Sequence, residues 1–164
     1  MKHRLVVVIG ASIVLGVLLL PGSGQAANAG EACQIAGSAT ITPGLTLKPH
    51  SGTVSFSGNL TNCHGSGKGI TSGSVTGSAS GLGSCEAGKS HLSATISWNN
   101  GKTTTLPFTT KGALAAVVVT GTASSGEFAG HGAAATLAFQ PVGGPTKCTT
   151  GVTQATFTGA EAPS

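Results

Sequence analysis

The chain has no aspartate and no tyrosine, and its four acidic residues are all glutamates. Charged residues make up 7% of the sequence and aromatic residues 4%, with a single tryptophan. Acid–base catalysis depends on side chains whose pKa values can be tuned close to neutrality, and these are few and scattered here. We therefore predict that the protein is not an enzyme and has no cofactor.

Long apolar runs are also scarce, and the longest one lies at the N-terminus. Basic residues in Met1–Arg4 precede a largely apolar run of sixteen residues, Leu5–Leu20, and Ala27–Ala29 supplies small residues of the kind a signal peptidase reads. The run is short for a hydrocarbon core of ~30 Å and is interrupted by glycines. It predicts a secretory signal peptide over residues 1–29 and one extracellular domain over residues 30–164, with no membrane attachment after cleavage.

Positive charge is too dispersed for a nucleic-acid groove. After removal of residues 1–29, the chain has six lysines against four glutamates, a formal charge of +2, and no arginine. A nucleic-acid groove needs clustered cations interleaved with aromatic platforms. We therefore exclude nucleic acid as a partner.

Four cysteines, an even number in a chain with a secretory leader, predict two disulfides. No Cys-x-x-Cys motif is present, and the cysteine spacings of 30, 22 and 63 do not suggest a zinc site. Three pairings are possible. We predict Cys63–Cys85, which would tether the Gly/Ser-rich stretch between them, and Cys33–Cys148, because first and last strands often meet. No metal site is predicted from the histidines either, since none are spaced one or three residues apart.

The stretch His91–Phe108 predicts a β-hairpin around the only tryptophan. Apolar residues alternate with polar ones up to Trp98, as in a half-buried strand, and alternation resumes after Gly101. A three-residue turn pairs Trp98 with Lys102 and Leu92 with Phe108, and keeps every apolar side chain on one face. A register slip of one residue would invert that face. We therefore expect a buried Trp98 and a turn that ends on a left-handed Gly101.

Other segments alternate in the same way and are separated by turn residues. They lie at residues 33–42, 53–62, 133–139 and 152–158, and residues 70–83 form a weak strand region with Val75 and Ala79 as its core candidates. The seven apolar residues Ala113–Val119 are unbroken and predict a central strand buried on both faces. Together these segments predict an all-β fold: a small antiparallel β-sandwich or flattened barrel of about 8 strands with two disulfides.

One motif resembles a nucleotide site. Gly83–Ser90 matches the phosphate-binding pattern G-x-x-x-x-G-K-[ST] letter for letter. That pattern works between a strand and a helix, whose N-terminus holds the phosphates. The residues that follow alternate as a strand, and the chain has no aspartate to help hold Mg²⁺. We therefore interpret the segment as a loop tethered by a disulfide, with no nucleotide as partner.

The longest connection, Gly121–Gly132, contains the candidate binding residues Glu127, Phe128 and His131. Two serines in the same loop could complete a hydrolase triad, but no nucleophile elbow G-x-S-x-G occurs in the chain. We expect this loop to be the place where a partner, an extracellular protein or a glycan, makes contact.

Several short motifs resemble those of small secreted proteins from high-GC Gram-positive bacteria. They are Thr53–Gly58 followed by Cys63, Ser84–Cys85, Ile96–Gly101 and Thr120–Gly130. The resemblance covers most of the chain after the leader and implies an all-β secreted domain without implying an activity. The composition is similar to that of enediyne-binding apoproteins, secreted Gly/Ala/Thr-rich sandwiches with two disulfides, although their bridges close shorter loops.

Three functional classes follow from these features. We expect first a non-catalytic extracellular module that binds a partner or has a structural role. The alternative is a carrier of an apolar small molecule, for which a deep apolar pocket would be required. A hydrolase is third, and it would need Glu and His side chains that converge in one cleft.

Overall fold

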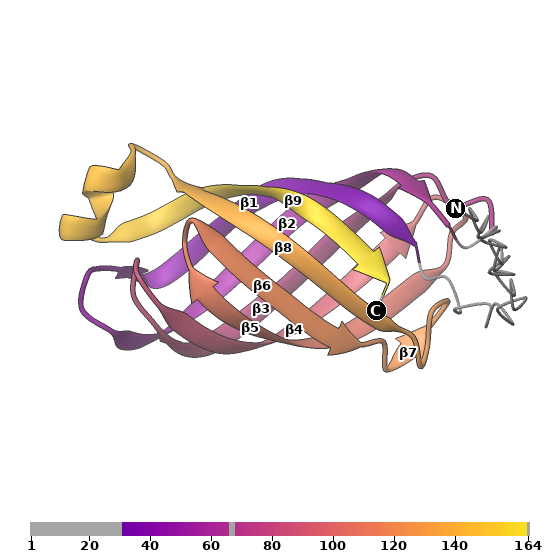
Figure 1. Ribbon diagram of the computed structural model, residues 1–164, viewed down its shortest axis with the longest axis horizontal. Helices are drawn as coiled ribbons and strands as arrows, with labels where there is room; N and C mark the ends of the chain where they lie inside the picture. Colours follow the sequence, from indigo (N-terminus) through magenta and orange to yellow (C-terminus); the bar gives the residue numbers. More distant parts are fainter. Residues whose placement is uncertain (1–30, 66–67, 164) are drawn as a thin grey trace, which may run out of the picture.

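The computed structural model describes residues 31–65 and 68–163 (Figure 1), so the predicted signal peptide, residues 1–29, lies outside the described residues. No helix in the described residues is long and apolar enough to cross a membrane. These residues form strands and one short 3-10 helix: β1 (Ala32–Leu45), β2 (His50–His64), β3 (Gly73–Gly83), β4 (Gly88–Trp98), β5 (Thr103–Ala113), β6 (Ala116–Thr122), β7 (Ser125–Gly126), β8 (Gly132–Pro141), η1 (Pro145–Thr149) and β9 (Val152–Pro163).

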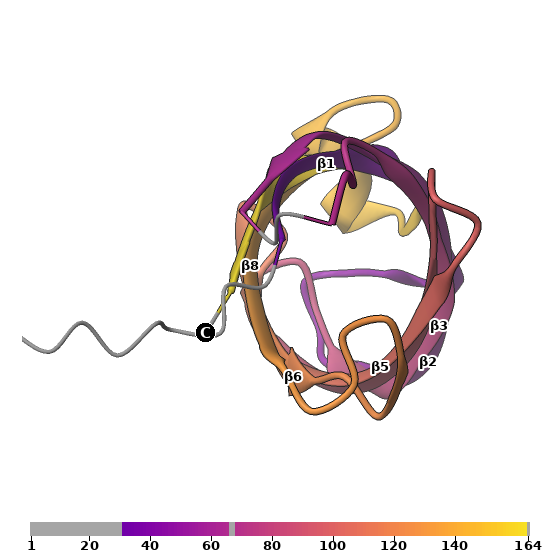
Figure 2. The ribbon, with the colours of Figure 1, turned by 90° about the vertical axis from the view of Figure 1, so that its right-hand side faces the viewer.

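The strands close into an antiparallel barrel. Each long strand pairs with the next one along the chain, and β9 returns to pair with β1. The pairing of β4 with β5 completes a ring of eight strands, and the two-residue β7 adds to β5. The closed ring is visible along the barrel axis (Figure 2). The all-β prediction is confirmed, and of the two predicted architectures the barrel is the one found.

The tryptophan hairpin has the predicted register. Leu92 pairs with Phe108 and Ala94 with Leu106, and the amide of Trp98 donates to the carbonyl oxygen of Lys102 over 2.8 Å. Gly101 has a φ of 80°, a left-handed conformation that costs glycine little. Trp98 is 5% exposed, so its predicted burial is confirmed.

Because successive strands are antiparallel, the connections between them alternate between the two ends of the barrel. The tryptophan end carries Trp98 and the connecting residues 65, 68–72, 99–102 and 123–131. The η1 end carries the connections at residues 46–49, 84–87, 114–115 and 142–151. Figure 1 shows the two ends at opposite extremes of the long axis, with η1 at one of them.

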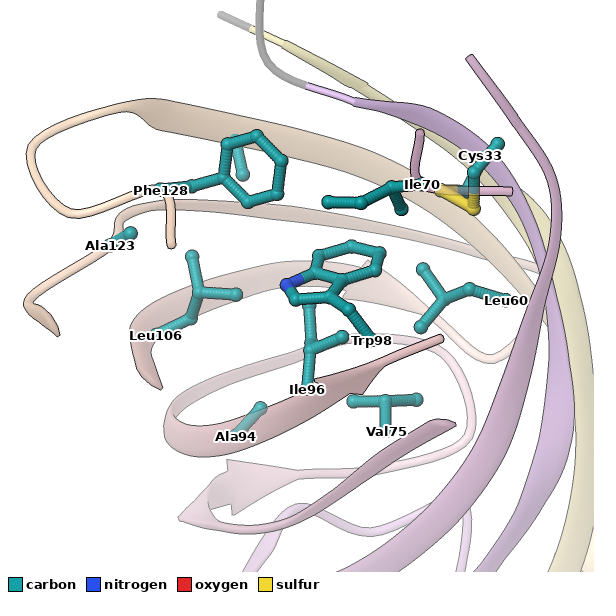
Figure 3. Packing of buried hydrophobic residues seen from close by; sticks show 12 residues of the cluster. Cys33, Leu60, Ile70, Val75, Ala94, Ile96, Trp98, Leu106, Ala123 and Phe128 are labelled. Atoms are coloured by element: carbon teal, nitrogen blue, oxygen red, sulfur yellow. A yellow bond between two sulfur atoms is a disulfide. The ribbon is translucent and has the colours of Figure 1, made fainter. Parts of the chain in front are cut away.

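Inward-facing side chains fill the tryptophan end more completely than the η1 end. Trp98 packs with Leu60, Ile70 and Leu106 in the larger cluster (Figure 3). The smaller cluster near the η1 end is built on Ile41, Val152 and Ala155. The described core is thus concentrated at one end of the barrel.

Some inward positions must be glycine because neighbouring strands approach them closely. A Cβ on Gly37 would collide with the backbone carbonyl of Ser57 and with the ring of Phe157. Glycines at such places let a sheet bend sharply enough to close into a small barrel. The glycine content therefore belongs to the architecture as well as to the turns.

The predicted disulfide pairing is wrong. All four cysteines are bridged, but the bonds are Cys33–Cys63 and Cys85–Cys148. The terminal strands β1 and β9 do lie side by side, as predicted, with Cys33 opposite Glu161. They are antiparallel, however, so Cys33 lies at the tryptophan end while Cys148, just before β9, lies at the η1 end. Either predicted bridge would have to span the length of the barrel.

The prediction of a central strand at Ala113–Val119 is also wrong. β5 ends at Ala113, the chain turns at residues 114–115, and β6 begins at Ala116. Val118 points outward and is 48% exposed. A single-layered barrel has no strand covered on both faces. The apolar run therefore consists of the end of β5, a tight turn and the start of β6.

Candidate functional site

The three predicted binding residues, Glu127, Phe128 and His131, lie together at the tryptophan end. There they cover the end of the barrel instead of forming an exposed contact surface. Phe128 is only 6% exposed, and its ring packs edge-on against Trp98 with 5.4 Å between centroids (Figure 3). The His131 ring packs edge-on against Phe128, with 6.2 Å between the ring centroids. Phe128 thus belongs to the core rather than to an exposed contact surface.

Glu127 stabilises this closed end by ion pairs with two lysines from different loops. Its Oε1 lies 3.2 Å from Nζ of Lys68, and its Oε2 lies 2.7 Å from Nζ of Lys102. The hydrogen bond from Lys102 is the main cause that holds the pKa of Glu127 below its ordinary value, and Lys68 adds to the effect while burial opposes it. Lys68 also lies over the Phe128 ring, 4.9 Å from its centroid. The three connections at this end are thereby joined.

The segment with the phosphate-binding pattern is a hairpin turn. Gly83 ends β3 and Gly88 begins β4, so the segment runs from strand to strand without a helix. The hydroxyl of Ser84 accepts hydrogen bonds from the amides of Glu86 and Ala87, each over 3.2 Å. The bridge from Cys85 to Cys148 ties the turn to the η1 connection. The predicted disulfide-tethered loop is confirmed.

The principal cavity lies inside the barrel, toward the η1 end, with a volume of about 140 Å³. Seven strands contribute to its wall, which shows that it occupies the interior rather than a surface groove. Its apolar lining comes mainly from Ile41, Leu45, Val54, Phe56, Ala79, Leu92, Leu114, Val117 and Phe139.

Glycines from neighbouring strands form part of the wall of this cavity. Across three neighbouring strands, Gly83 pairs with Gly88, and Gly88 pairs with Gly112. All three line the cavity, as do Gly52 and Gly81 of the adjacent level. A Cβ added at Gly83 would meet nothing closer than 3.5 Å, so this part of the wall has room for a larger residue.

His50 is the polar side chain that distinguishes the cavity. It begins β2, pairs with Gly83 across the sheet and lines the cavity beside the glycine row. Its Nδ1 lies 3.1 Å from the carbonyl oxygen of Lys48. Its Nε2 is the one buried side-chain polar atom among the described residues without a hydrogen-bond partner. Buried polar atoms are normally paired, so this nitrogen needs an explanation.

Two hydroxyls in the wall are hydrogen-bonded to each other. Ser90 and Thr110 face one another on β4 and β5, and one hydroxyl donates to the other. Both residues line the cavity. Each of these side chains therefore has a partner, whereas Nε2 of His50 has none.

A second polar feature lies near the tryptophan end. Glu161 faces inward from β9 and borders two smaller cavities, of about 20 and 50 Å³. Burial, followed by the charge of Glu31, raises the pKa of Glu161 to about 7. Glu31 is itself 5% exposed. In the described part of the chain, no group of three or more His, Cys, Asp or Glu side chains could hold a metal ion.

No protein-family model and no curated protein matches this chain. Its function therefore has to be inferred from the barrel itself. The cavity and His50 are the features that sequence reasoning missed. The signal lay in the inward phase of three strands, where His50, Gly52, Gly81, Gly83 and Gly88 stand at positions that would otherwise carry core side chains.

Proposed function

We propose that the protein is a secreted, non-catalytic carrier whose barrel holds a small, largely apolar ligand in the cavity at the η1 end. The observation that carries this proposal is an apolar cavity of about 140 Å³ lined by residues of seven strands. An apolar cavity of about 150 Å³ suffices to bind benzene. Eight-stranded barrels are wide enough to hold one small ligand. The ligand we propose is therefore close to a single ring in size.

Secretion is part of the same proposal. It is supported by the leader-like N-terminal sequence and by the two disulfides, which form and persist in oxidising compartments. A carrier agrees with the shortage of catalytic groups. It also refines the broader expectation of an extracellular binding module. The outward hydroxyls of β4, such as Ser93 and Thr95, are exposed, but ordinary solvated surfaces carry the same groups. We therefore rank the carrier above a glycan-binding or protein-binding surface.

Toluene is a suitable probe because it matches the size and polarity of the cavity. We expect its titration into the ¹⁵N-labelled protein to give saturable shifts for the amides of Gly81, Gly83 and Gly88, with little change around Trp98. No saturable shift at millimolar toluene would refute the carrier proposal. Shifts centred on the tryptophan end would relocate the site.

Two variants test whether the cavity itself is occupied. Ala79 faces the cavity and is 7% exposed, so Ala79→Leu should fill it and weaken toluene binding by about tenfold or more. Gly83→Ala is the gentler change, since a Cβ fits there, and we expect about threefold weakening. The matched control is Ser78→Leu, an outward change one residue from Ala79, which should leave binding unchanged.

A further inference from the structure

We propose that the ligand carries one hydrogen-bond donor, an O–H or N–H group, which binds Nε2 of His50. This inference rests on the proposed carrier function and specifies the chemistry of its ligand. A ring of phenol size with a single donor is the class of molecule that the cavity fits.

The hydrogen bond at the other nitrogen fixes the role of Nε2. The partner of Nδ1 is the carbonyl oxygen of Lys48, which can only accept. Nδ1 must therefore carry the proton of the neutral imidazole. In that tautomer Nε2 has a lone pair and no hydrogen, so it is an acceptor. A ligand that satisfies it must bring a donor.

The surroundings of His50 leave this acceptor to the ligand. No donor among the described residues reaches its Nε2, and the row beside it on the sheet, Gly83, Gly88 and Gly112, carries no side-chain donor. The hydroxyls of Ser90 and Thr110 are bonded to each other. A buried acceptor without a partner destabilises the protein. A donor on the ligand supplies the missing partner.

The glycine row also gives the ligand's apolar body a place beside the imidazole. Gly83 pairs directly with His50 and has no side chain, and an added Cβ there would meet nothing closer than 3.5 Å, so there is open space beside the imidazole. The cavity volume of about 140 Å³ matches one six-membered ring with a small substituent. A polar molecule with several donors would leave most of them unpaired against the apolar wall.

Phenol and toluene form the test pair, because they have nearly the same shape and differ in the hydroxyl donor. Affinities for both are measured for the wild-type chain and for His50→Phe, which keeps a ring but removes Nε2. We expect the ratio of phenol affinity to toluene affinity to fall about fivefold to tenfold in His50→Phe, the net worth of one hydrogen bond. Toluene affinity itself should change by less than about twofold.

The chain offers a closely matched control. His64 lies at the far end of the same strand, is exposed, and its Nδ1 is also bonded to the carbonyl two residues before it, in Asn62, over 2.9 Å. His64→Phe should leave the phenol-to-toluene ratio unchanged. An equal ratio in wild type and His50→Phe overturns the assignment of His50 while leaving the carrier proposal intact. If neither probe binds, the carrier proposal fails and this inference fails with it.

A measurement on the unmodified protein guards against a variant that does not fold. The ¹⁵N resonance of His50 Nε2 should shift when phenol is added and remain nearly unchanged with toluene. Benzaldehyde, which has an acceptor and no hydroxyl, should behave like toluene. A larger Nε2 shift with benzaldehyde than with phenol would show that Nε2 donates, which contradicts the proposal.

Discussion

The indole Nε1 of Trp98 donates a hydrogen bond to Oγ1 of Thr104 across the hairpin, over 2.9 Å. The two residues are not direct partners, because Thr104 pairs with Ile96, so the bond is diagonal. Thr104 is 1% exposed and lies inside the barrel. This contact explains how a buried tryptophan keeps its polar atom satisfied at the end of an otherwise apolar strand face.

Thr104→Val should therefore destabilise the barrel although it preserves side-chain shape. The indole N–H would stay buried without a partner, at a cost of about 1–3 kcal/mol. Chemical denaturation followed by Trp98 fluorescence measures the change. Thr103→Val, at the exposed neighbouring position, is the control and should change stability by less than about 0.5 kcal/mol. Equal stability of both variants would show that the hydrogen bond contributes nothing.

The disulfides provide a second prediction. Peptide mapping of the unreduced protein should recover Cys33–Cys63 and Cys85–Cys148, one at each end of the barrel. The bridges close loops with sequence separations of 30 and 63 residues. In the chain-entropy description each contributes about 4 kcal/mol. Replacing one pair by alanines should lower the free energy of unfolding by about that amount. Recovery of Cys63–Cys85 would contradict the strand directions of the barrel.

The contrast between the hairpin and the disulfides shows which relationships were readable from sequence. The hairpin register was predicted correctly because a slip of one residue would have turned Trp98 or Leu106 outward. No comparable constraint linked the cysteines. The Gly/Ser-rich stretch between them favours a Cys63–Cys85 bridge, but Cys63 lies at the tryptophan end and Cys85 at the η1 end, with the length of β3 between them.

The cavity was harder to predict because it depends on side chains that are missing. Gly81 and Gly83 belong to a weak strand region of the sequence, whereas in the barrel both line the cavity and Gly83 leaves room for a side chain. Glu161 was readable in principle, since it continues the inward phase of Phe157 and Gly159 along β9.

The closure of the tryptophan end supplies a third prediction. Glu127→Gln removes the charge that pairs with Lys68 and Lys102, so the loop at residues 123–131 should open more often. Hydrogen exchange at the amides of Phe128 and His131 should become faster, while exchange within β3 stays the same. Because the pKa of Glu127 is lowered, the loop should stay protected in wild type until the pH falls through that lowered pKa. Glu86→Gln, an exposed change at the η1 end, should not alter this exchange.

The buried carboxyl group of Glu161 predicts an unusual dependence of stability on pH. Burial and the nearby charge of Glu31 raise its pKa from an ordinary 4.5 to about 7 in the folded barrel. The folded state therefore binds this proton more tightly than the unfolded chain does. Between pH 4.5 and about pH 7 the folded state holds more protons at this site, so the free energy of unfolding must fall as the pH rises. Above about pH 7 the free energy of unfolding has lost the whole contribution of this proton.

A shift of this size corresponds to about 3 kcal/mol, at about 1.4 kcal/mol per pKa unit. Glu161→Gln keeps the side-chain shape without the ionisable group, so it should match wild type near pH 4.5 and exceed its stability at pH 8 by up to that amount. Denaturant unfolding at pH 4.5, 6 and 8 gives the comparison, and the difference between variant and wild type isolates this group from other titrations. Glu86→Gln should follow the wild-type curve throughout. A difference between Glu161→Gln and wild type that stays constant with pH would show that Glu161 is ionised in the folded barrel at neutral pH.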